Sequence, residues 1–416
     1  MEFGERPRLS AAPSTRQWLK RFSAGDQPAA ARLVDALMLM NAEDVASALR
    51  AQLARLAETR SGPRAKAALY AEREFAERAI FKSQIAPGRD GQSRIRAYGD
   101  RGPAAVNPIR GRARVGSEGE GAFVISQAVQ ASKRKFLNHP GPDRIRRHRV
   151  GLIVIVTDFI GTGTRIRAML DKFLATPSVR AWRSNRWTHF AVVAASGTEQ
   201  GIRQVRGHQS RPEVWVAHIA TTLAGYPNAA ISAGWYGLTI NYGPRHARGA
   251  GPQGFQGGGA LIAFSYRTPN NTPLLLHEGG GGWVPLFDGP IAADMGPAFG
   301  IQSPGVRARE GAEATGAPIA EDLLPSEVRT VLVLRAVRGR WRPGQEVELA
   351  ERTGLSTLEI GDAKAGALQR GLLTAEGRLT DAGQRLVHAG ATSEPRAPEI
   401  PTAELPYYPQ ALRASR

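Results

Sequence analysis

The amino-acid sequence predicts an α/β fold built on a mostly parallel sheet, with a helical region before the sheet and a compact helical unit after it. Residues 152–156 form a continuous, largely β-branched apolar run, which is typical of a strand buried on both faces. Further candidate strands at 190–195, 260–265 and, more weakly, 215–219 alternate with helical or Gly-rich segments between residues 113 and 290. Strands that alternate with helices favour a parallel sheet.

The first 60 residues carry apolar side chains at helical spacing. Over residues 29–40, Leu33, Leu37 and Met40 fall on one stripe, which predicts a helix there. Residues 44–56 repeat the pattern, and Asn41 is the expected N-cap of that second helix.

The 416 residues are enough for two or three domains at roughly 150 residues each. Residues 86–114 are rich in Gly, Pro and Arg and look loop-like, and so does the Gly-rich segment 243–259. The expected parts are a helical N-terminal region at 1–85, an α/β domain at 86–300, a linker at 301–322, a compact unit at 323–390 and a Pro-rich tail at 391–416.

The charge balance points to a polyanionic partner. The formal net charge is +18 and the pI is about 10.9, which favours nucleic acid, nucleotides or phosphate groups. A GC-rich coding bias explains Arg in place of Lys but does not readily create such a surplus. Four arginines, Arg144, Arg146, Arg147 and Arg149, precede the central strand and form either a solvated basic face or an extension of a polyanion track.

Cysteine is absent, which excludes disulfides, thiolate nucleophiles and Cys-type metal sites, and fits a reducing cytoplasm. No stretch approaches the ~20 apolar residues of a membrane helix, and no secretory pattern opens the chain, so we expect a cytoplasmic protein without a membrane partner. The eight histidines show no spacing typical of a metal site.

A short Gly- and Thr-rich turn follows the central strand. The strand is expected to end at Asp158, and a helix is expected from about Arg165 to Phe173. Glycines in such a turn let successive N–H groups point into one concavity, and the following helix adds its positive end, so the turn predicts a phosphate cradle. Asp158, at the carboxyl end of the strand, can accept hydrogen bonds from ribose hydroxyls. The alternative is a generic turn without a ligand; a Walker P-loop is excluded because the Gly-Lys-Ser/Thr ending is missing.

Residues 154–164 resemble the phosphoribosyl-pyrophosphate motif of type I phosphoribosyltransferases. The resemblance implies that Asp158 is the second acidic residue, which binds ribose and Mg²⁺. It also implies that Gly161, Thr162, Gly163 and Thr164 hold the 5′-phosphate. The sequence departs from the motif at two places: Thr157 occupies the first acidic position, and Arg165 occupies the terminal Thr position. Loss of one carboxylate predicts weaker handling of ribose and Mg²⁺.

Two further segments are candidate parts of the site. Residues 115–121 resemble the early loop that holds pyrophosphate in phosphoribosyltransferases. The resemblance makes Ser117 a candidate ligand contact and Glu118 and Glu120 candidate catalytic residues. The alternative is an ordinary helix start capped by Ser117. Residues 264–273 run from a strand into a turn with Asn270 and Asn271, either as ligand contacts or as turn formers.

Together with the Trp283-x-Pro-Leu-Phe287 ending, these segments are similar to phosphoribosyltransferase-like proteins of bacterial conflict systems. Some proteins of that group are encoded beside retron reverse transcriptases.

Residues 326–390 read as helix, helix, turn, helix, small hairpin and helix, which resembles the winged helix-turn-helix family. The resemblance implies DNA contacts through Ser356 and Thr357, phosphate contacts through Lys364 and Arg370, and a wing contact through Arg378. The alternative role of such a unit is docking to a protein partner.

Three functions follow from these expectations. The first is a toxic effector of an anti-phage system that binds phosphoribosyl pyrophosphate or a nucleotide and acts at its anomeric carbon. A reverse transcriptase with its RNA–DNA hybrid would restrain it. The second is a non-enzymatic, nucleotide-sensing DNA-binding regulator, and the third is a metabolic base-salvage enzyme. The sequence leaves the base, the trigger and an oligomeric state open.

Overall fold

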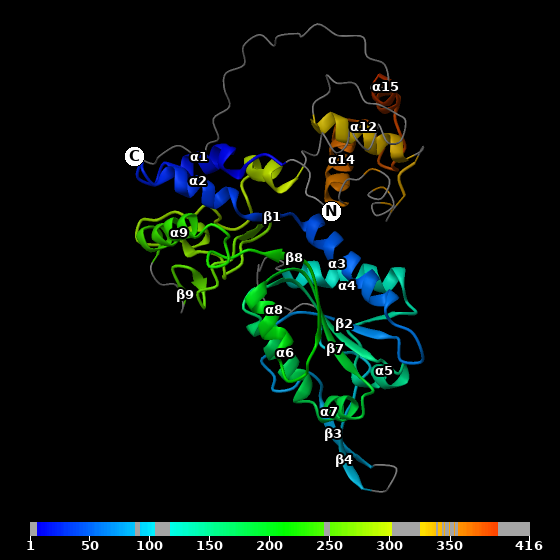
Figure 1. Cartoon of the computed structure of the whole chain (residues 1–416). Coiled ribbons are helices and arrows are strands. Elements are labelled where there is room, and N and C mark those ends of the chain that lie inside the picture. Colours follow the sequence, from blue (N-terminus) through cyan, green and yellow to red (C-terminus); the bar gives the residue numbers. More distant parts are fainter. Residues whose placement is uncertain are drawn as a thin grey trace, which may run out of the picture. The chain divides into compact units, whose positions relative to one another are not determined.

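The computed structural model describes residues 6–87, 92–104, 117–244, 250–301, 325–337, 340–342, 345, 349, 353 and 357–389 (Figure 1). The chain divides into two compact units, Met1–Ile301 and Gln302–Arg416. Within the described residues no helix is long and apolar enough to cross a membrane.

A five-stranded parallel sheet lies at the centre of the first unit, which confirms the predicted fold class. Its strand order is β5-β2-β6-β7-β8, and all four pairings are parallel. The central strand β6 lies between two neighbours and is buried on both faces, as its apolar run predicts. The strands are β2 (Ala67–Ala71), β5 (Phe136–Asn138), β6 (Leu152–Ile160), β7 (His189–Thr198) and β8 (Glu213–Ala220).

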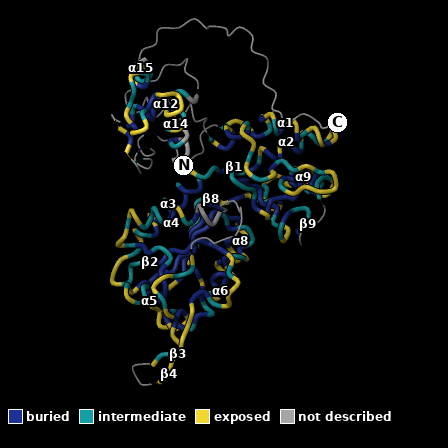
Figure 2. Tube along the Cα trace, turned by 180° about the vertical axis from the view of Figure 1, so that it is seen from behind, coloured by how far each residue is buried: buried dark blue, intermediate teal, exposed yellow. Residues whose placement is uncertain are grey.

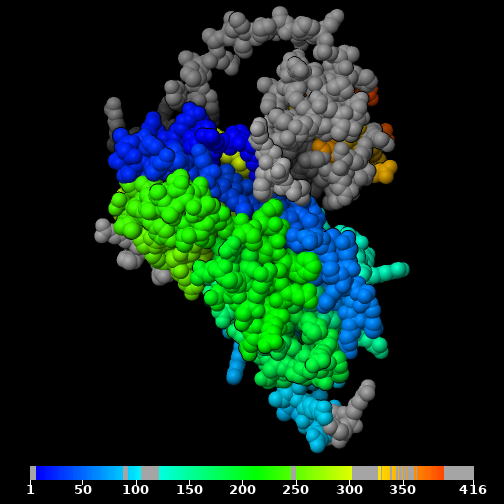
Figure 3. All heavy atoms as spheres, in the orientation of Figure 1, coloured from blue at the N-terminus to red at the C-terminus, as the bar shows by residue number. Residues whose placement is uncertain are grey.

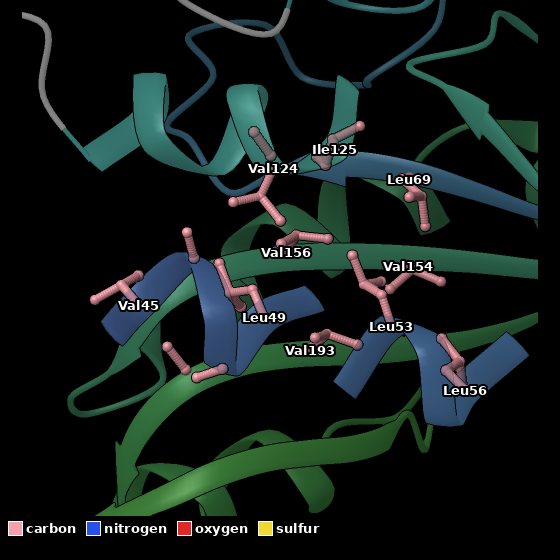
Figure 4. Close-up of a cluster of buried hydrophobic side chains, with 14 of the residues drawn as sticks. Val45, Leu49, Leu53, Leu56, Leu69, Val124, Ile125, Val154, Val156 and Val193 are labelled. Atoms are coloured by element: carbon pink, nitrogen blue, oxygen red, sulfur yellow. The ribbon is translucent and has the colours of Figure 1, made fainter. Parts of the chain in front are cut away.

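Helices cover both faces of the sheet. On one face, α3 (Ala42–Glu58) and α4 (Ser117–Ala131) pack on the sheet, and Figure 4 shows Leu49 and Leu53 of α3 against Val154 and Val193. The other face packs on side chains from α5 (Pro142–Arg147), α6 (Thr164–Leu174), α7 (Pro177–Ser184) and α8 (Glu199–Arg206). The strands β2, β6 and β7 are therefore almost entirely buried, whereas the edge strand β8 is mostly half-buried (Figure 2).

A third hydrophobic cluster joins the two ends of the first unit. It contains side chains of α1 (Pro13–Leu19), α2 (Gln27–Asp35), α9 (Ala229–Asn241), α10 (Leu274–His277) and the 3-10 helix η2 (Ala293–Phe299). Asn41 caps α3 in a full capping box, as the sequence predicts.

The prediction of one helix over 29–40 is wrong at its end. The helix α2 ends at Asp35, and β1 (Met38–Met40) pairs in parallel with β11 (Ile262–Phe264). Met40 is fully buried, so pairing with a distant strand outweighs the local helical spacing. The strand expected at 260–265 therefore forms, but outside the five-stranded sheet.

Two other expectations for the first unit need correction. The region 1–85 is not purely helical, because β2 lies inside the main sheet. The loop-like stretch after residue 85 contains most of an antiparallel hairpin, β3 (Ser83–Pro87) with β4 (Ser93–Ala97). In the Gly-rich stretch 243–259, β9 (Ala250–Gly251) pairs with β10 (Gly254–Phe255), and residues 245–249 lie outside the described part.

The second unit has the helices and the hairpin predicted for a winged helix. Its helices are α12 (Pro325–Val337), α14 (Thr357–Gln369) and α15 (Asp381–Ala389). Leu373 pairs with Leu379 across a turn in which Gly377 has φ +77°, which forms the wing. Apolar side chains of the three helices share one core with Trp341. Most of the helix expected at 345–352, and Ser356, lie outside the described residues.

Candidate functional site

The turn between β6 and α6 is held by close backbone packing. Gly163 has φ +77° and precedes the first residue of α6, and no side chain caps that helix end. The Thr198 hydroxyl donates to the Gly161 carbonyl oxygen at 2.6 Å. A Cβ atom on Gly161 would lie 2.0 Å from Oδ1 of Asn271, so any larger residue there would force the turn or the Asn271 side chain to shift. The first N–H groups of an α-helix have no intrahelical acceptor, so the amides at the start of α6 are available to an anion.

This turn borders a pocket of about 430 Å³. The pocket contains the predicted loop and the two predicted asparagines, although about a hundred residues separate them in the sequence. It is lined by Glu72, Glu74, Asp158, Phe159, Ile160, Gly161, Thr162, Gly163, Thr164, Arg165, Ile166, Phe255, Arg267, Thr268, Pro269, Asn270 and Asn271. The structure therefore brings together Asp158, the 161–165 loop and both asparagines, which sequence reasoning had assigned from separate segments.

Asp158 reaches the pocket as a nearly buried carboxylate. Its side chain is 4% exposed, and its Oδ2 atom accepts from the Tyr266 hydroxyl at 3.1 Å and from an Arg267 guanidinium nitrogen at 3.4 Å. Arg267 and Tyr266 lie in the segment that follows β11, so this segment closes over the carboxyl end of β6. A carboxyl group can accept several hydrogen bonds, so Asp158 can accept one from a ribose hydroxyl in addition to these two contacts.

A second buried carboxylate, Glu72, was missed in the sequence. Glu72 directly follows β2, and its side chain is 7% exposed. The Thr157 hydroxyl lies 3.4 Å from Glu72 Oε2, so Glu72 stands beside the position where the phosphoribosyltransferase motif has its first acid. The signal was a short apolar run, residues 67–71, that ends in an acidic residue.

Arg165, the residue after the 161–164 turn, forms an ion pair with Glu72. Its Nε atom lies 2.9 Å from Glu72 Oε1 and 3.5 Å from Glu74 Oε1. The pocket thus contains two arginine–carboxylate pairs, Arg165 with Glu72 and Arg267 with Asp158. Three carboxylates against two guanidinium groups line it, so a phosphorylated ligand would add negative charge to a site that is already slightly negative.

The donor set fits Mg²⁺ bound jointly with a ligand. Carboxylate oxygens are hard donors, and Mg²⁺ is usually held by one or two carboxylates together with phosphate oxygens. No group of three or more His, Cys, Asp or Glu residues that could hold a metal by itself occurs in the described part of the chain. Glu72 and Asp158 are the residues that would share such an ion with a phosphate.

His139 lies next to the same sheet edge. Its Nε2 atom accepts from the Ala71 backbone N–H at 2.9 Å, one residue before Glu72. Burial, followed by the nearby positive charge of Arg73, lowers the pKa of His139 to about 4. His139 is therefore neutral near pH 7 and holds the end of β2 in place.

The first turn of α4 begins at this edge as well. A Cβ atom on Gly121 would lie 3.7 Å from the Ala71 Cβ and 3.8 Å from the Val156 carbonyl oxygen. Ser117, Glu118 and Glu120 belong to this helix, but their side chains lie outside the described residues. The segment predicted from the early loop is thus close to the carboxyl ends of β2 and β6.

In the second unit, the predicted nucleic-acid contacts are in different environments. The Lys364 ammonium lies over the Trp341 ring at 4.6 Å, and Arg370 donates to the Thr330 hydroxyl at 2.7 Å. Arg378 is exposed on the wing. Thr357 begins α14, but its side chain, like Ser356, lies outside the described residues.

Two family models match the chain. A family described as PRTase-CE matches residues 15–288, and one described as wHTH-PRTase associated matches residues 331–414. Among solved structures, the AQ2163 protein from Aquifex aeolicus is similar over 35% of this chain and 69% of its own, with 12% identity and a TM-score of 0.19. No curated protein matches the sequence. Since the first match spans well over half of its residues, the chain belongs to the PRTase-CE family and carries a wHTH-PRTase associated domain over residues 331–414.

Proposed function

We propose that this protein is a phosphoribosyltransferase-like effector that binds phosphoribosyl pyrophosphate or a nucleotide in the pocket after β6. The observation that carries the proposal is the joint placement of the 161–164 turn, the two buried carboxylates and both asparagines around one cavity of about 430 Å³. Cavities of roughly 300–1,000 Å³ suit small-molecule ligands. In this arrangement the turn and the start of α6 hold the 5′-phosphate, and Asp158 accepts from the ribose hydroxyls.

The chemistry that fits such a ligand is substitution at its anomeric carbon. The bond from C1′ to a base nitrogen or a diphosphate oxygen breaks, and the leaving group keeps the electron pair. Water or another base then bonds to C1′. Mg²⁺, shared between the ligand phosphates and a carboxylate, would neutralise negative charge in the pocket. The buried Glu72 compensates for the threonine at position 157.

The biological role that we propose is anti-phage defence, by toxic action on nucleotide pools. It rests on the similarity of the 158–163 and 264–287 segments to conflict-system proteins. The winged helix would contact DNA or a nucleic-acid-bearing partner, such as a reverse transcriptase with its RNA–DNA hybrid. The net charge of +18 supports a polyanionic partner of either kind.

Nucleotide profiling by mass spectrometry tests the enzyme directly. Cells that express the wild type should grow poorly and show a changed nucleotide pool, and Asp158→Asn should restore both. Asn keeps the shape of the side chain but loses the charge that pairs with Arg267. Unchanged pools with the wild type would remove the enzymatic role.

A nucleotide-sensing regulator is the second candidate, and one observation favours it. Asp158 already has two partners, Tyr266 and Arg267, so it can help to hold a ligand without taking part in chemistry. A regulator would bind ribose 5-phosphate or a nucleoside monophosphate in calorimetry and show a sharp operator footprint, without toxicity or a change in nucleotide pools.

A further inference from the structure

The hairpin of β3 and β4 is a two-stranded ribbon that stands out from the first unit (Figures 1 and 3). Ile85 and Ile95 lie directly opposite each other in its register, and they are 75% and 58% exposed. Directly opposed residues of an antiparallel pair share one face. Large exposed apolar side chains that meet in this way typically mark a binding surface.

The other face of the ribbon is basic. Arg96 lies opposite Gln84 and Arg94 opposite Ala86, and both arginines are exposed. The ribbon thus has one apolar face, centred on the isoleucine pair, and one cationic face.

The root of the ribbon is fixed on two helices. The Ala97 N–H donates to the Ser178 hydroxyl of α7 at 2.8 Å, and Arg146 of α5 donates to the Ala97 carbonyl at 2.6 Å. Arg146 also lies over the Trp182 ring of α7 at 5.6 Å. An anchored root means that the ribbon can present its side chains in a defined direction.

Basic residues continue from the ribbon onto α5. Residues 93–104 and 142–149 contain seven arginines and two aspartates, and each aspartate, Asp100 and Asp143, is paired with an arginine of α5. This end of the unit is therefore strongly cationic, and it includes the arginine cluster noted in the sequence. Burial, and then Lys66, Arg144 and Arg147, lower the pKa of His148 at the end of α5, which agrees with a positive local field.

We infer that the β3–β4 ribbon is a docking arm for double-stranded DNA, separate from both the ligand pocket and the winged helix. The major groove of B-form DNA, about 12 Å wide, admits a two-stranded ribbon, and apolar side chains there contact thymine methyl groups. In A-form RNA the corresponding groove is too deep and narrow to be read by side chains. The isoleucine pair faces the base edges, and the long side chains of Arg94 and Arg96, which start from the opposite face, extend past the strand edges to the phosphates at the rim of the groove.

Binding of the full chain to a 20-base-pair DNA duplex, measured by fluorescence anisotropy over a range of salt concentrations, tests the inference. Each lost phosphate contact should weaken binding about fivefold at 0.15 M salt and reduce the slope of log K against log[salt] by about 0.9. Arg94→Ala/Arg96→Ala should therefore bind about thirtyfold more weakly, with a slope reduced by about 1.8. The control Arg16→Ala/Arg21→Ala removes two exposed arginines from the α1 region. It should reduce both the DNA affinity and the salt slope by less than the ribbon variant does.

A second variant separates the two faces. Ile85→Ser/Ile95→Ser removes the apolar pair and keeps every charge, so it should weaken DNA binding several-fold with an unchanged salt slope. Both variants should keep the wild-type melting temperature and the wild-type affinity for phosphoribosyl pyrophosphate, because the altered residues are exposed and do not line the pocket.

Three results would overturn the inference. The arginine variant could bind DNA as its control does, or an RNA duplex could bind as tightly as DNA with the same dependence on Arg94 and Arg96. The isoleucine variant could instead lose self-association in sedimentation while it keeps DNA binding, which would assign the ribbon to contacts between copies of the chain.

Discussion

Replacing Gly161 by alanine should loosen the turn between β6 and α6 without changing any charged group. The new Cβ would lie 2.0 Å from Asn271 Oδ1 and 2.5 Å from its Cγ, whereas ordinary contacts begin near 3.4 Å. The turn and Asn271 must therefore separate by about 1.4 Å relative to each other. Asn271 is 6% exposed and cannot move aside freely, and overpacking of this kind costs about 1–3 kcal/mol.

Two measurements follow from this displacement. The melting temperature should fall by roughly 2–12 °C, because each kcal/mol shifts it by about 2–4 °C in large domains. A displacement of about 1 Å at a binding loop can reduce the loop's contribution to binding and catalysis by up to about a hundredfold. Calorimetry should therefore show at least a tenfold loss of affinity for ribose 5-phosphate. Gly234→Ala is the matched control: that glycine lies in α9 with nothing within 4 Å of the added atom, and the change should be neutral or stabilising by about 0.5–1 kcal/mol.

A double variant checks that the clash is the cause. Asn271→Ala removes the three atoms that a Cβ on Gly161 would meet, so the double variant should recover stability relative to Gly161→Ala alone. The reasoning is refuted if Gly161→Ala binds ribose 5-phosphate like the wild type, or if the two changes are simply additive.

Three further predictions concern other parts of the protein. Mg²⁺ should increase the affinity for phosphoribosyl pyrophosphate, and Glu72→Gln should reduce this increase about tenfold, or by about 1.4 kcal/mol. Glu74→Gln should leave the increase unchanged, because Glu74 is 79% exposed. Calorimetry with and without Mg²⁺ measures both effects. The pKa of His139 is lowered to about 4 in the folded state, against about 6.5 when unfolded. The contribution of His139 to the free energy of unfolding is therefore fully present above pH 6.5, and up to about 3 kcal/mol of it is lost as the pH falls towards 4. Urea unfolding at several pH values should show this loss. His139→Asn should reduce the pH dependence, since asparagine tolerates the local φ of +41°. Arg378→Ala on the wing should weaken DNA binding about fivefold at 0.15 M salt, and unchanged binding would favour protein docking by the winged helix.

The sequence predicted those elements that local patterns determine. The β-branched run of β6 and the amphipathic helix α3 with its Asn41 cap both form, because burial on two faces and a capping box are read directly from neighbouring residues. The strand β1 was not predicted, since Met38–Met40 fits a helical stripe and becomes a strand only by pairing with β11, more than two hundred residues later. The ribbon of β3 and β4 was missed for a similar reason: its side chains are exposed on both faces and leave no periodic apolar signal.

The candidate site divides in the same way. Asp158, the 161–164 turn and Asn271 follow from local sequence, and the structure gathers them at one pocket. The partners of Asp158 could not be predicted, because Tyr266 and Arg267 reach it only through the fold of the segment after β11. The strand was expected to end at Asp158, but β6 runs two residues further, to Ile160, so the carboxylate lies near the end of the strand and not at it. The sequence also could not show that an arginine already pairs with this carboxylate.

A linear motif cannot show a carboxylate that a neighbouring strand supplies, and Glu72 is such a case. The motif places two acids in succession on one strand, so their side chains point to opposite faces of the sheet. Here Thr157 takes the first position, and the parallel register that pairs Ala71 with Val156 sets Glu72 beside Thr157. A carboxylate therefore stands on each side of β6, one from β6 itself and one from β2, and each has its own arginine. Because the register of two strands distant in sequence produces this arrangement, only the three-dimensional structure could reveal that a second buried carboxylate lies beside Thr157.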